Sequence, residues 1–206
     1  QQLTDLLEPA RDKNPAYLKA VLEELRVRGD VRTQPDFVKQ LPTTLEGLFY
    51  YVIDCLDADF RGVFPVFDAI AYLAASKAGL SENELLQLIE GQVPPLYWAR
   101  IRRRLDAFLV QRGAILDVAS SALWEVAESR ISNLAEYRVR LASYLSTQTI
   151  ARRVDEGLWQ LARANAWEQL QEELTALPVV NWFSGKQAWQ EWFDYWDQIP
   201  GWHNVF

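Results

Sequence analysis

The chain is 206 residues long, carries a net charge of −7, and is 50% apolar and 24% charged by residue count. This length is enough for one large or two small domains with a real core, and the composition is typical of a soluble globular protein. The acidic balance argues against a dedicated nucleic-acid-binding protein, which would carry an excess of basic residues.

Features that the sequence lacks exclude further classes. No apolar run approaches the roughly 18 residues of a membrane-spanning helix, and the first residues do not have the pattern of a signal peptide. The single cysteine, Cys55, cannot form an internal disulfide and fits the reducing cytoplasm. Because the chain contains no methionine, not even at position 1, we expect it to be an internal piece of a longer protein or a trimmed form of the protein.

The first forty residues predict two helices and a connector. A short helix is expected at 2–8. A longer one is expected at 15–27, because Asn14 can cap it and Pro15 fits the first helical position, where a missing N–H costs nothing. The polar stretch 28–37 contains a glycine and a proline and predicts a connector.

The middle of the chain has the order of a winged helix. Several segments have helical period, and one of them begins with a capping box formed by Ser81 and Glu84. Two short β-capable runs around Arg112 and Gly113 predict a β-hairpin within 108–119. Three helices followed by a hairpin is the winged-helix order. The expected helices are 41–60, 63–79, 81–91, 94–108 and 121–131.

After Ile131 the pattern predicts only helices. Residues 151–174 look like an αα-hairpin with Ala164 and Asn165 at the turn. Stacked helix pairs suggest a solenoid such as tetratricopeptide (TPR) repeats, although the sequence has no exact 34-residue period. We therefore predict antiparallel, TPR-like helical hairpins. The expected helices are 133–147, 150–164, 166–177 and 186–198.

Five arginines are the strongest basic feature. In a DNA-binding winged helix the third helix enters the major groove and the hairpin contacts phosphate. The alternative is that these side chains extend over the core or bind carboxylates. We favour the alternative, because the same helix carries core-type apolar residues and a fold alone does not assign function. The arginines are Arg100, Arg102, Arg103, Arg104 and Arg112.

Aromatic residues gather near the end of the chain. Trp189, Trp192, Phe193 and Trp196 follow one face of the predicted last helix. Aromatic faces of this kind can stack on single-stranded nucleic acid or on sugars. The more usual role is packing against a neighbouring helix, which we favour here.

The sequence offers no catalytic or metal-binding pattern. The only histidine, His203, has no nucleophile near it, and no set of Cys and His residues predicts a zinc site. Ser184-Gly185-Lys186 is not a phosphate-binding loop, because Val180 stands where that motif needs its first glycine. We therefore predict no catalytic residue and no metal site.

The order of these parts resembles the C-terminal half of a NACHT-type STAND ATPase module, as in nephrocystin-3 and telomerase-associated protein 1. The resemblance runs through NPAYLKAVLEELRVRGD, LPTTLEGLFYYVIDCL, VFDAIAYLAASKAGLSENELLQLI and PPLYWARIRRRLDAFLVQRGAILDVASSALWEVAESRI. LAEYRVRLASYL and RRVDEGLWQLARANAWEQLQEEL resemble the helical linker that leads to TPR or propeller repeats in those proteins.

The resemblance implies a nucleotide site shared with an upstream core. Pro15, with Asn14 beside it, matches the motif that lies against the adenine of bound ATP or ADP. Ser120, followed by Ser121, stands where many relatives carry a histidine that reaches the ADP phosphate; serine supplies only a hydroxyl. The Walker A and Walker B segments, which bind the nucleotide with Mg²⁺, are not in this chain. We therefore expect it to hydrolyse no ATP alone and to bind nucleotide poorly.

We accordingly predict a mainly α-helical chain with three parts. Residues 1–40 are the end of a helical nucleotide-binding subdomain, 41–131 a winged helix with one small β-hairpin, and 132–206 a helical linker with TPR-like hairpins. The expected function is regulatory: control of a nucleotide-dependent closed-to-open change and of homo-oligomerisation. The expected partners are an upstream NTPase core and a downstream repeat or sensor domain, in the cytoplasm and without a membrane. A helical protein-interaction scaffold and, less favoured, a DNA-binding regulator are the alternatives.

Overall fold

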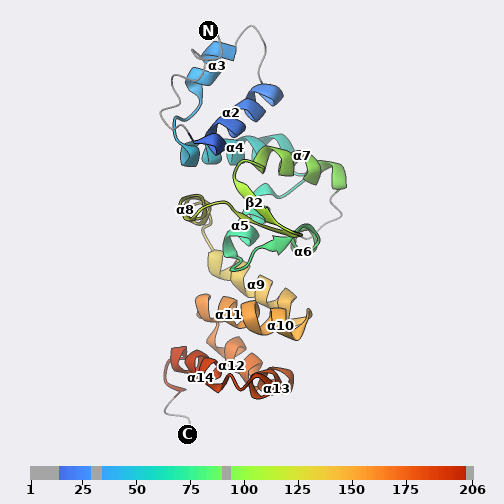
Figure 1. Ribbon diagram of the computed structural model, residues 1–206, viewed down its shortest axis with the longest axis vertical. Helices are drawn as coiled ribbons and strands as arrows, with labels where there is room; N and C mark the ends of the chain where they lie inside the picture. Colours follow the sequence, from blue (N-terminus) through green and yellow to red (C-terminus); the bar gives the residue numbers. More distant parts are fainter. Residues whose placement is uncertain (1–13, 29–33, 90–93, 203–206) are drawn as a thin grey trace. The chain divides into compact units, whose positions relative to one another are not determined.

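The computed structural model describes residues 14–28, 34–89 and 94–202, and these residues are mainly helical with a small antiparallel sheet (Figure 1). The chain divides into two compact units. The first unit comprises Gln1–Ala74 and Gly79–Ile131, and the second comprises Ala75–Ala78 and Ser132–Phe206. The helix predicted at 2–8 and His203 lie outside the described residues.

The first unit follows the predicted winged-helix order. Its helix at Pro15 begins as expected, and Thr44 and Ser81 cap two others through their hydroxyl groups. The capping box of Ser81 and Glu84 is confirmed, since each side chain accepts a hydrogen bond from the backbone N–H of the other residue. The helices are α2 (Pro15–Arg28), α3 (Gln34–Gln40), α4 (Leu45–Phe60), α5 (Val66–Ala75), α6 (Glu82–Leu88), α7 (Pro95–Leu105) and α8 (Ser121–Ser129).

The described part of this unit contains a three-stranded antiparallel sheet of β1 (Leu80–Ser81), β2 (Leu109–Arg112) and β3 (Ile115–Val118). The predicted hairpin is confirmed, with Arg112 opposite Ile115 in the register. The additional strand, β1, pairs with β3 and places Leu80 opposite Leu116. The sequence did not predict β1, because two residues are too short to show a period.

Two expectations about helix positions in this unit were wrong. The segment 28–37 is not only a connector, because α3 begins at Gln34 and contains Pro35 in its first turn, where proline is tolerated. The helix predicted over 63–79 spans only Val66–Ala75.

The core of the first unit is formed by α4, α5, α7, α8 and the sheet, and most of α5 is buried in it. The predicted apolar side of α4 is confirmed, and Phe49 packs on Phe108 with ring centroids 4.9 Å apart. Ala20 and Val21 of α2 are also buried, so α2 packs on this core.

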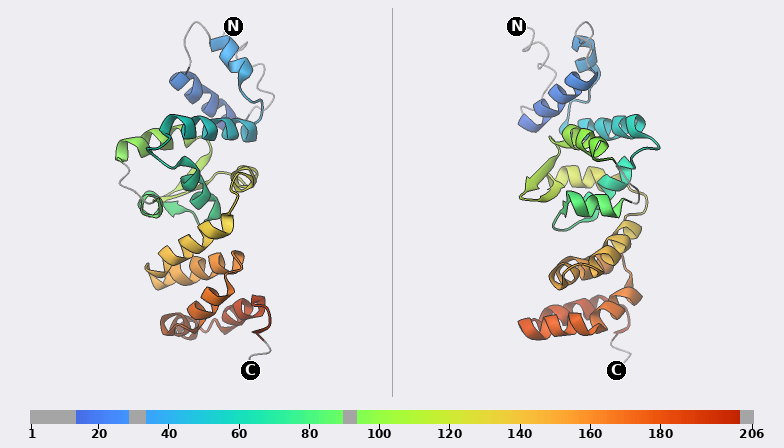
Figure 2. Two further views of the ribbon diagram at one scale, coloured as in Figure 1. Left: turned by 180° about the vertical axis from the view of Figure 1, so that it is seen from behind. Right: turned by 90° about the vertical axis from the view of Figure 1, so that its right-hand side faces the viewer.

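The second unit consists of antiparallel helical hairpins, as predicted (Figure 2). Asn165, with φ of 55°, makes the expected turn between two helices. The region predicted as one helix over 150–164 contains a π-helical turn. The helices are α9 (Leu134–Ser146), α10 (Ile150–Arg152), the π-helix η1 (Arg153–Gly157), α11 (Leu158–Arg163), α12 (Trp167–Thr175), α13 (Leu177–Lys186) and α14 (Trp189–Gln198).

The helix α13 was not predicted, because Pro178 and two adjacent valines do not favour a helix. Pro178 is the second residue of α13, where it is tolerated, and Phe183 anchors the helix in the core of the unit. The prediction that the tryptophans of the last helix pack against neighbouring helices is confirmed for the inner side of α14, where Trp192 and Trp196 pack on that core.

Candidate functional site

Asn14 and Pro15 form the start of α2. The side-chain Oδ1 of Asn14 accepts a hydrogen bond from the backbone N–H of Ala16 at 2.9 Å, and its carbonyl accepts one from Leu18 at 3.2 Å. Pro15 is exposed in the first turn. Tyr17, in the same turn, donates its hydroxyl to the carbonyl of Pro42 at 2.9 Å and ties this end of α2 to the segment before α4. Burial raises the pKa of Tyr17.

Ser120 and Ser121 form the start of α8. The hydroxyl of Ser120 accepts a hydrogen bond from the backbone N–H of Leu123 at 3.3 Å, so it serves as the N-cap of the helix. Ser121 is the first residue of α8, and both serines are exposed. Their observed role is therefore local, and the nucleotide role remains a prediction.

Arg104 is the most buried of the predicted arginines, with 5% of its side chain exposed. Its Nε and Nη2 donate to the two carboxylate oxygens of Glu24 in α2, both at 2.8 Å. Its Nη1 donates to Asp59 Oδ2 in α4 at 2.9 Å. The guanidinium of Arg104 thus joins α7 to α2 and α4. The helical period of the sequence did not indicate Glu24 as its partner.

Three other arginines are also paired with carboxylates. Arg103 Nε lies 3.0 Å from Glu23 Oε1, and Arg102 Nη1 lies 3.0 Å from Asp106 Oδ1. Arg112, in the hairpin, pairs at 3.7 Å with Asp117 on the neighbouring strand. Each of these groups also has a second partner: Glu23 pairs with Arg26, Asp106 with Lys19, and Arg102 with Glu82.

These pairs bear on the DNA-binding alternative. That alternative needs the arginines of α7 to form one exposed face. Arg104 is buried, and the side chain of Arg102 is 14% exposed and paired. Arg103 and Arg104 hold α7 against α2, and Arg104 also holds it against α4.

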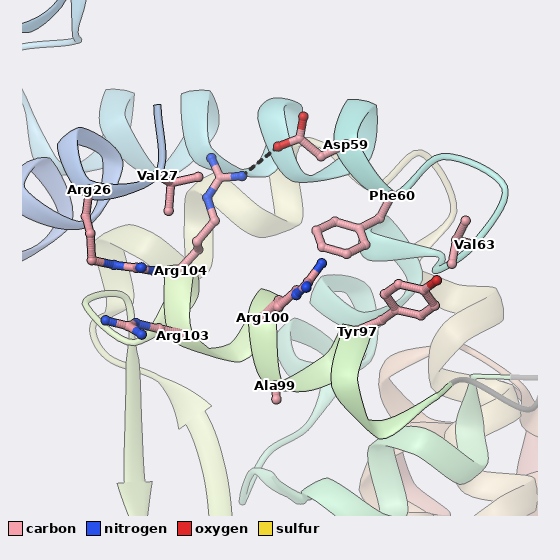
Figure 3. Close-up of a pocket in the computed structure, with 10 residues that line it drawn as sticks. All are labelled: Arg26, Val27, Asp59, Phe60, Val63, Tyr97, Ala99, Arg100, Arg103 and Arg104. Atoms are coloured by element: carbon pink, nitrogen blue, oxygen red, sulfur yellow. Dashed lines mark hydrogen bonds and ion pairs between the residues drawn. The ribbon is translucent and has the colours of Figure 1, made fainter. Parts of the chain in front are cut away.

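A cleft of about 880 Å³ lies beside these contacts (Figure 3). Arg100 points into the cleft toward the ring of Phe60. The rings of Phe60 and Tyr97 meet edge-on, with their centroids 6.0 Å apart. Among the residues that the structure describes, Arg100 has no ion pair. We call this the arginine cleft; it is lined by Arg26, Val27, Asp59, Phe60, Val63, Tyr97, Ala99, Arg100, Arg103 and Arg104.

The outer part of the arginine cleft is positively charged. Arg26 and Arg103 share the carboxylate of Glu23, and Arg100 adds a further charge nearby. The hydrogen bond from Arg26 is the main cause that lowers the pKa of Glu23, and Arg103 acts in the same direction. The arrangement suits a negatively charged ligand that also offers an apolar or aromatic group.

The second unit contains a buried polar network that sequence reasoning missed. Glu156, in the π-helical turn, is 1% exposed and accepts hydrogen bonds from the hydroxyl of Ser76 at 2.7 Å and the backbone N–H of Lys77 at 3.0 Å. Gln160 donates to Glu156 at 3.3 Å and to the carbonyl of Ala75 at 2.8 Å. This network holds 75–78 within the unit. A π-helical turn inserts one residue into a helix, and such an insertion has no clear signal in sequence.

Other kinds of site are not found in the described ranges. Within 14–28, 34–89 and 94–202 no group of three or more His, Cys, Asp or Glu residues could hold a metal ion. Over the same ranges, no helix combines the length and the apolar character that crossing a membrane requires.

Comparison with known proteins finds a distant relative. The chain is 20% identical, over 199 residues, to a TPR repeat-containing protein of Dictyostelium discoideum. The match covers 90% of this chain but only 12% of that relative, so the chain spans a small part of the relative's length. No family model and no solved structure matches the chain. This similarity and the helical hairpins of the second unit are compatible with TPR-like repeats.

Proposed function

We propose that this chain is a regulatory part of a STAND-type NTPase switch. In this proposal α2 and α3 are the end of the nucleotide-binding helical subdomain, with Asn14 and Pro15 facing a nucleotide held by an upstream core with Mg²⁺. The winged helix and the helical hairpins then control the change from a closed to an open, oligomerising state. The observation that carries the proposal is the buried contact of Glu24 in α2 with Arg104 in α7.

The contact supports a switch because it joins the two parts that must separate. Breaking one partner of a buried ion pair leaves an uncompensated charge and costs about 3–5 kcal/mol. Weaker pairs, of Arg103 with Glu23 and of Lys19 with Asp106, also tie α2 to α7 and its C-terminal end. A nucleotide can shift the equilibrium between the closed and the open state only by its difference in affinity for those states. The stability of these contacts therefore sets how large that difference in affinity must be.

The hydroxyl of Ser120 is engaged as a helix cap. In the proposed switch the closed state is therefore held by the Glu24–Arg104 contact rather than by a cationic latch on the ADP phosphate. The chain itself would need no catalytic residue, since the Walker segments belong to the upstream core.

A helical protein-interaction scaffold is the second candidate. It is supported by the antiparallel hairpins of the second unit and by the similarity to a TPR repeat-containing protein. TPR-like hairpins stack into extended surfaces that bind other proteins. This function needs no nucleotide.

Nucleotide content separates the two candidates. The longest native form of the protein is purified from its own cells, denatured and analysed by ion-exchange chromatography. About one ADP or ATP per chain is expected for the switch, and folded protein without nucleotide would leave the scaffold as the better proposal.

A variant then tests the contact itself. Glu24→Gln should speed ADP release from the longest native form at least tenfold. Glu168→Gln, an exposed change in α12, is the control and should leave the rate unchanged. An unchanged rate in Glu24→Gln would contradict the role given to this contact.

A further inference from the structure

The side of α14 that faces away from the core of the second unit carries both aromatic and acidic residues. Trp189 and Phe193 are 39% and 45% exposed, and they lie one helical turn apart. Asp194 and Asp197 are exposed on the same side. We call Trp189, Gln190, Phe193, Asp194 and Asp197 the α14 outer face.

Trp189 and Phe193 are not among the buried core residues of the second unit, although both rings meet Trp192 edge-on, with ring centroids 5.9 Å and 5.1 Å apart. Trp192, on the inner side of α14, donates its indole N–H to the carbonyl of Leu174 at 3.1 Å and packs on the core with Trp196. The sides of Trp189 and Phe193 that face away from Trp192 remain exposed on the outer face. The surrounding segment 167–202 is also strongly acidic, with six carboxylates against one lysine.

The arginine cleft has the opposite character. Arg100 is exposed and points toward Phe60, while Arg26 and Arg103 share a single carboxylate. Apolar side chains border these cations, since Val27 and Val63 are 43% and 47% exposed. This local excess of positive charge lies on a chain whose net charge is −7.

We propose that the arginine cleft of one copy of the chain binds the α14 outer face of a second copy. Carboxylates of Asp194 and Asp197 would bind the guanidinium groups of Arg100 and Arg103, which suit planar, two-pronged contacts. Trp189 and Phe193 would pack on the aromatic and apolar border of the cleft. Arginine and large aromatic residues are the side chains most enriched at the energetic centre of protein interfaces.

The two surfaces differ. Their contact can therefore be made twice in a reciprocal twofold dimer, or it can repeat from copy to copy as a ring or an open chain of subunits. The net negative charge of each copy opposes association, and local charge complementarity sets the specificity. The proposal goes beyond the nucleotide switch and does not depend on it. Arg104 lines the cleft as well, but Arg100 and the α14 outer face take no part in the Glu24–Arg104 contact.

Sedimentation equilibrium of the 206-residue chain over a range of concentrations tests the proposal. We expect reversible self-association that Arg100→Glu and Asp194→Arg each weaken at least tenfold, since reversing one close charge pair at an interface costs more than about 1.4 kcal/mol. Arg112→Glu and Glu168→Arg make the same charge changes away from both surfaces, and the association constant of each should stay within about twofold of that of the parent chain.

Mixing the two variants gives the sharpest result. The Arg100→Glu copy keeps an intact α14 outer face, and the Asp194→Arg copy keeps an intact cleft. Their mixture should therefore associate at concentrations at which each variant alone stays monomeric, because only the mixture contains both an intact cleft and an intact α14 outer face. A chain that stays monomeric at every concentration, or self-association that neither variant weakens, would overturn the proposal. Nucleotide content does not enter this experiment, so its failure is distinct from failure of the proposed switch.

Discussion

Arg104 and Glu24 form a two-pronged ion pair, 80 residues apart in sequence, in which both donor–acceptor distances are 2.8 Å. Their side chains are 5% and 1% exposed, so neither charge is solvated by water. Asp59 accepts the remaining guanidinium contact at 2.9 Å. A buried charge depends on its partner, so loss of either side chain would leave an uncompensated charge between α2 and α7.

Replacement of Glu24 by glutamine should lower the free energy of unfolding of the chain by about 3 kcal/mol, because the buried guanidinium loses its main partner. Urea-induced unfolding measures the change. Asp57→Asn is the matched control: Asp57 pairs with the largely exposed Arg61 at 3.6 Å, and its loss should cost less than about 1 kcal/mol. Equal losses in the two variants would contradict the importance given to burial.

The ion pairs of Glu23 predict a dependence of stability on pH. Because Arg26 lowers the pKa of Glu23 below its ordinary value of 4.5, the folded state binds fewer protons than the unfolded state near that pH. The stability that this carboxylate contributes is complete above the unfolded pKa and is lost as the pH falls through the lower, folded pKa. Lys19 lowers the pKa of Asp106 and acts in the same direction below that group's ordinary value of 3.8.

The prediction is checked by comparing the parent chain with Glu23→Gln. The difference in unfolding free energy should be largest near neutral pH and should shrink as the pH is lowered below about 4.5. A difference that is independent of pH would mean that the charge of Glu23 plays no part.

Substitutions at Ser120 distinguish its role as a helix cap from a role toward phosphate. Ser120→Ala should lower stability by about 1 kcal/mol, because the N–H of Leu123 loses its acceptor. Ser120→Asp should restore the cap, since aspartate is an equally good N-cap. Ser121→Ala, one residue further along α8, is the control and should change little.

In the longest native form of the protein, Ser120→Asp also tests whether the phosphate of bound ADP lies near residue 120. A carboxylate beside an ADP phosphate would repel it, so bound ADP should fall while stability in the absence of nucleotide is kept. ADP content equal to that of the parent would place the phosphate away from Ser120.

Two glycines with positive φ differ in what surrounds them. Gly79 has φ of 78°, and a Cβ atom there would lie 2.5 Å from the carbonyl oxygen of Leu116 and 2.6 Å from Cγ2 of Ile115. Gly113, in the hairpin turn, has φ of 64°, and a Cβ atom there would meet nothing within 4 Å beyond its own chain neighbours. The first glycine is thus required by both conformation and space, and the second by conformation alone.

Gly113→Ala should therefore cost about 1 kcal/mol, the usual penalty for a left-handed alanine. Gly79→Ala should cost at least about 3 kcal/mol, because β3 must also move away from β1. Urea-induced unfolding of both variants checks the order, and a smaller loss for Gly79→Ala would contradict the observed packing of the two strands.

Local signals in the sequence predicted much of the fold. The start of α2 at Pro15, the capping box of Ser81 with Glu84, and the turn at Asn165 all depend on neighbours within four residues. The hairpin around Gly113 is of the same kind. The structure bears out these predictions because short-range hydrogen bonds and backbone preferences determine such features.

Other elements depend on contacts that are distant in sequence. β1 exists because Leu80 pairs with Leu116, and α13 is helical because Val179 and Phe183 are buried in the second unit. The π-helical turn that carries Glu156 likewise accompanies its hydrogen bonds to the segment 75–78. In each case tertiary packing outweighs weak or contrary local propensity.

The arginines of α7 show what local sequence patterns determine and what only tertiary packing decides. The sequence by itself determined that they lie on a helix of a winged-helix unit, because the apolar period and the hairpin are local patterns. Only the tertiary structure decided that Arg104 is buried against Glu24 while Arg100 opens into a cleft. The reason is that a side chain's charge is known from its sequence position, but its partner is brought close only by the packing of helices about 80 residues apart.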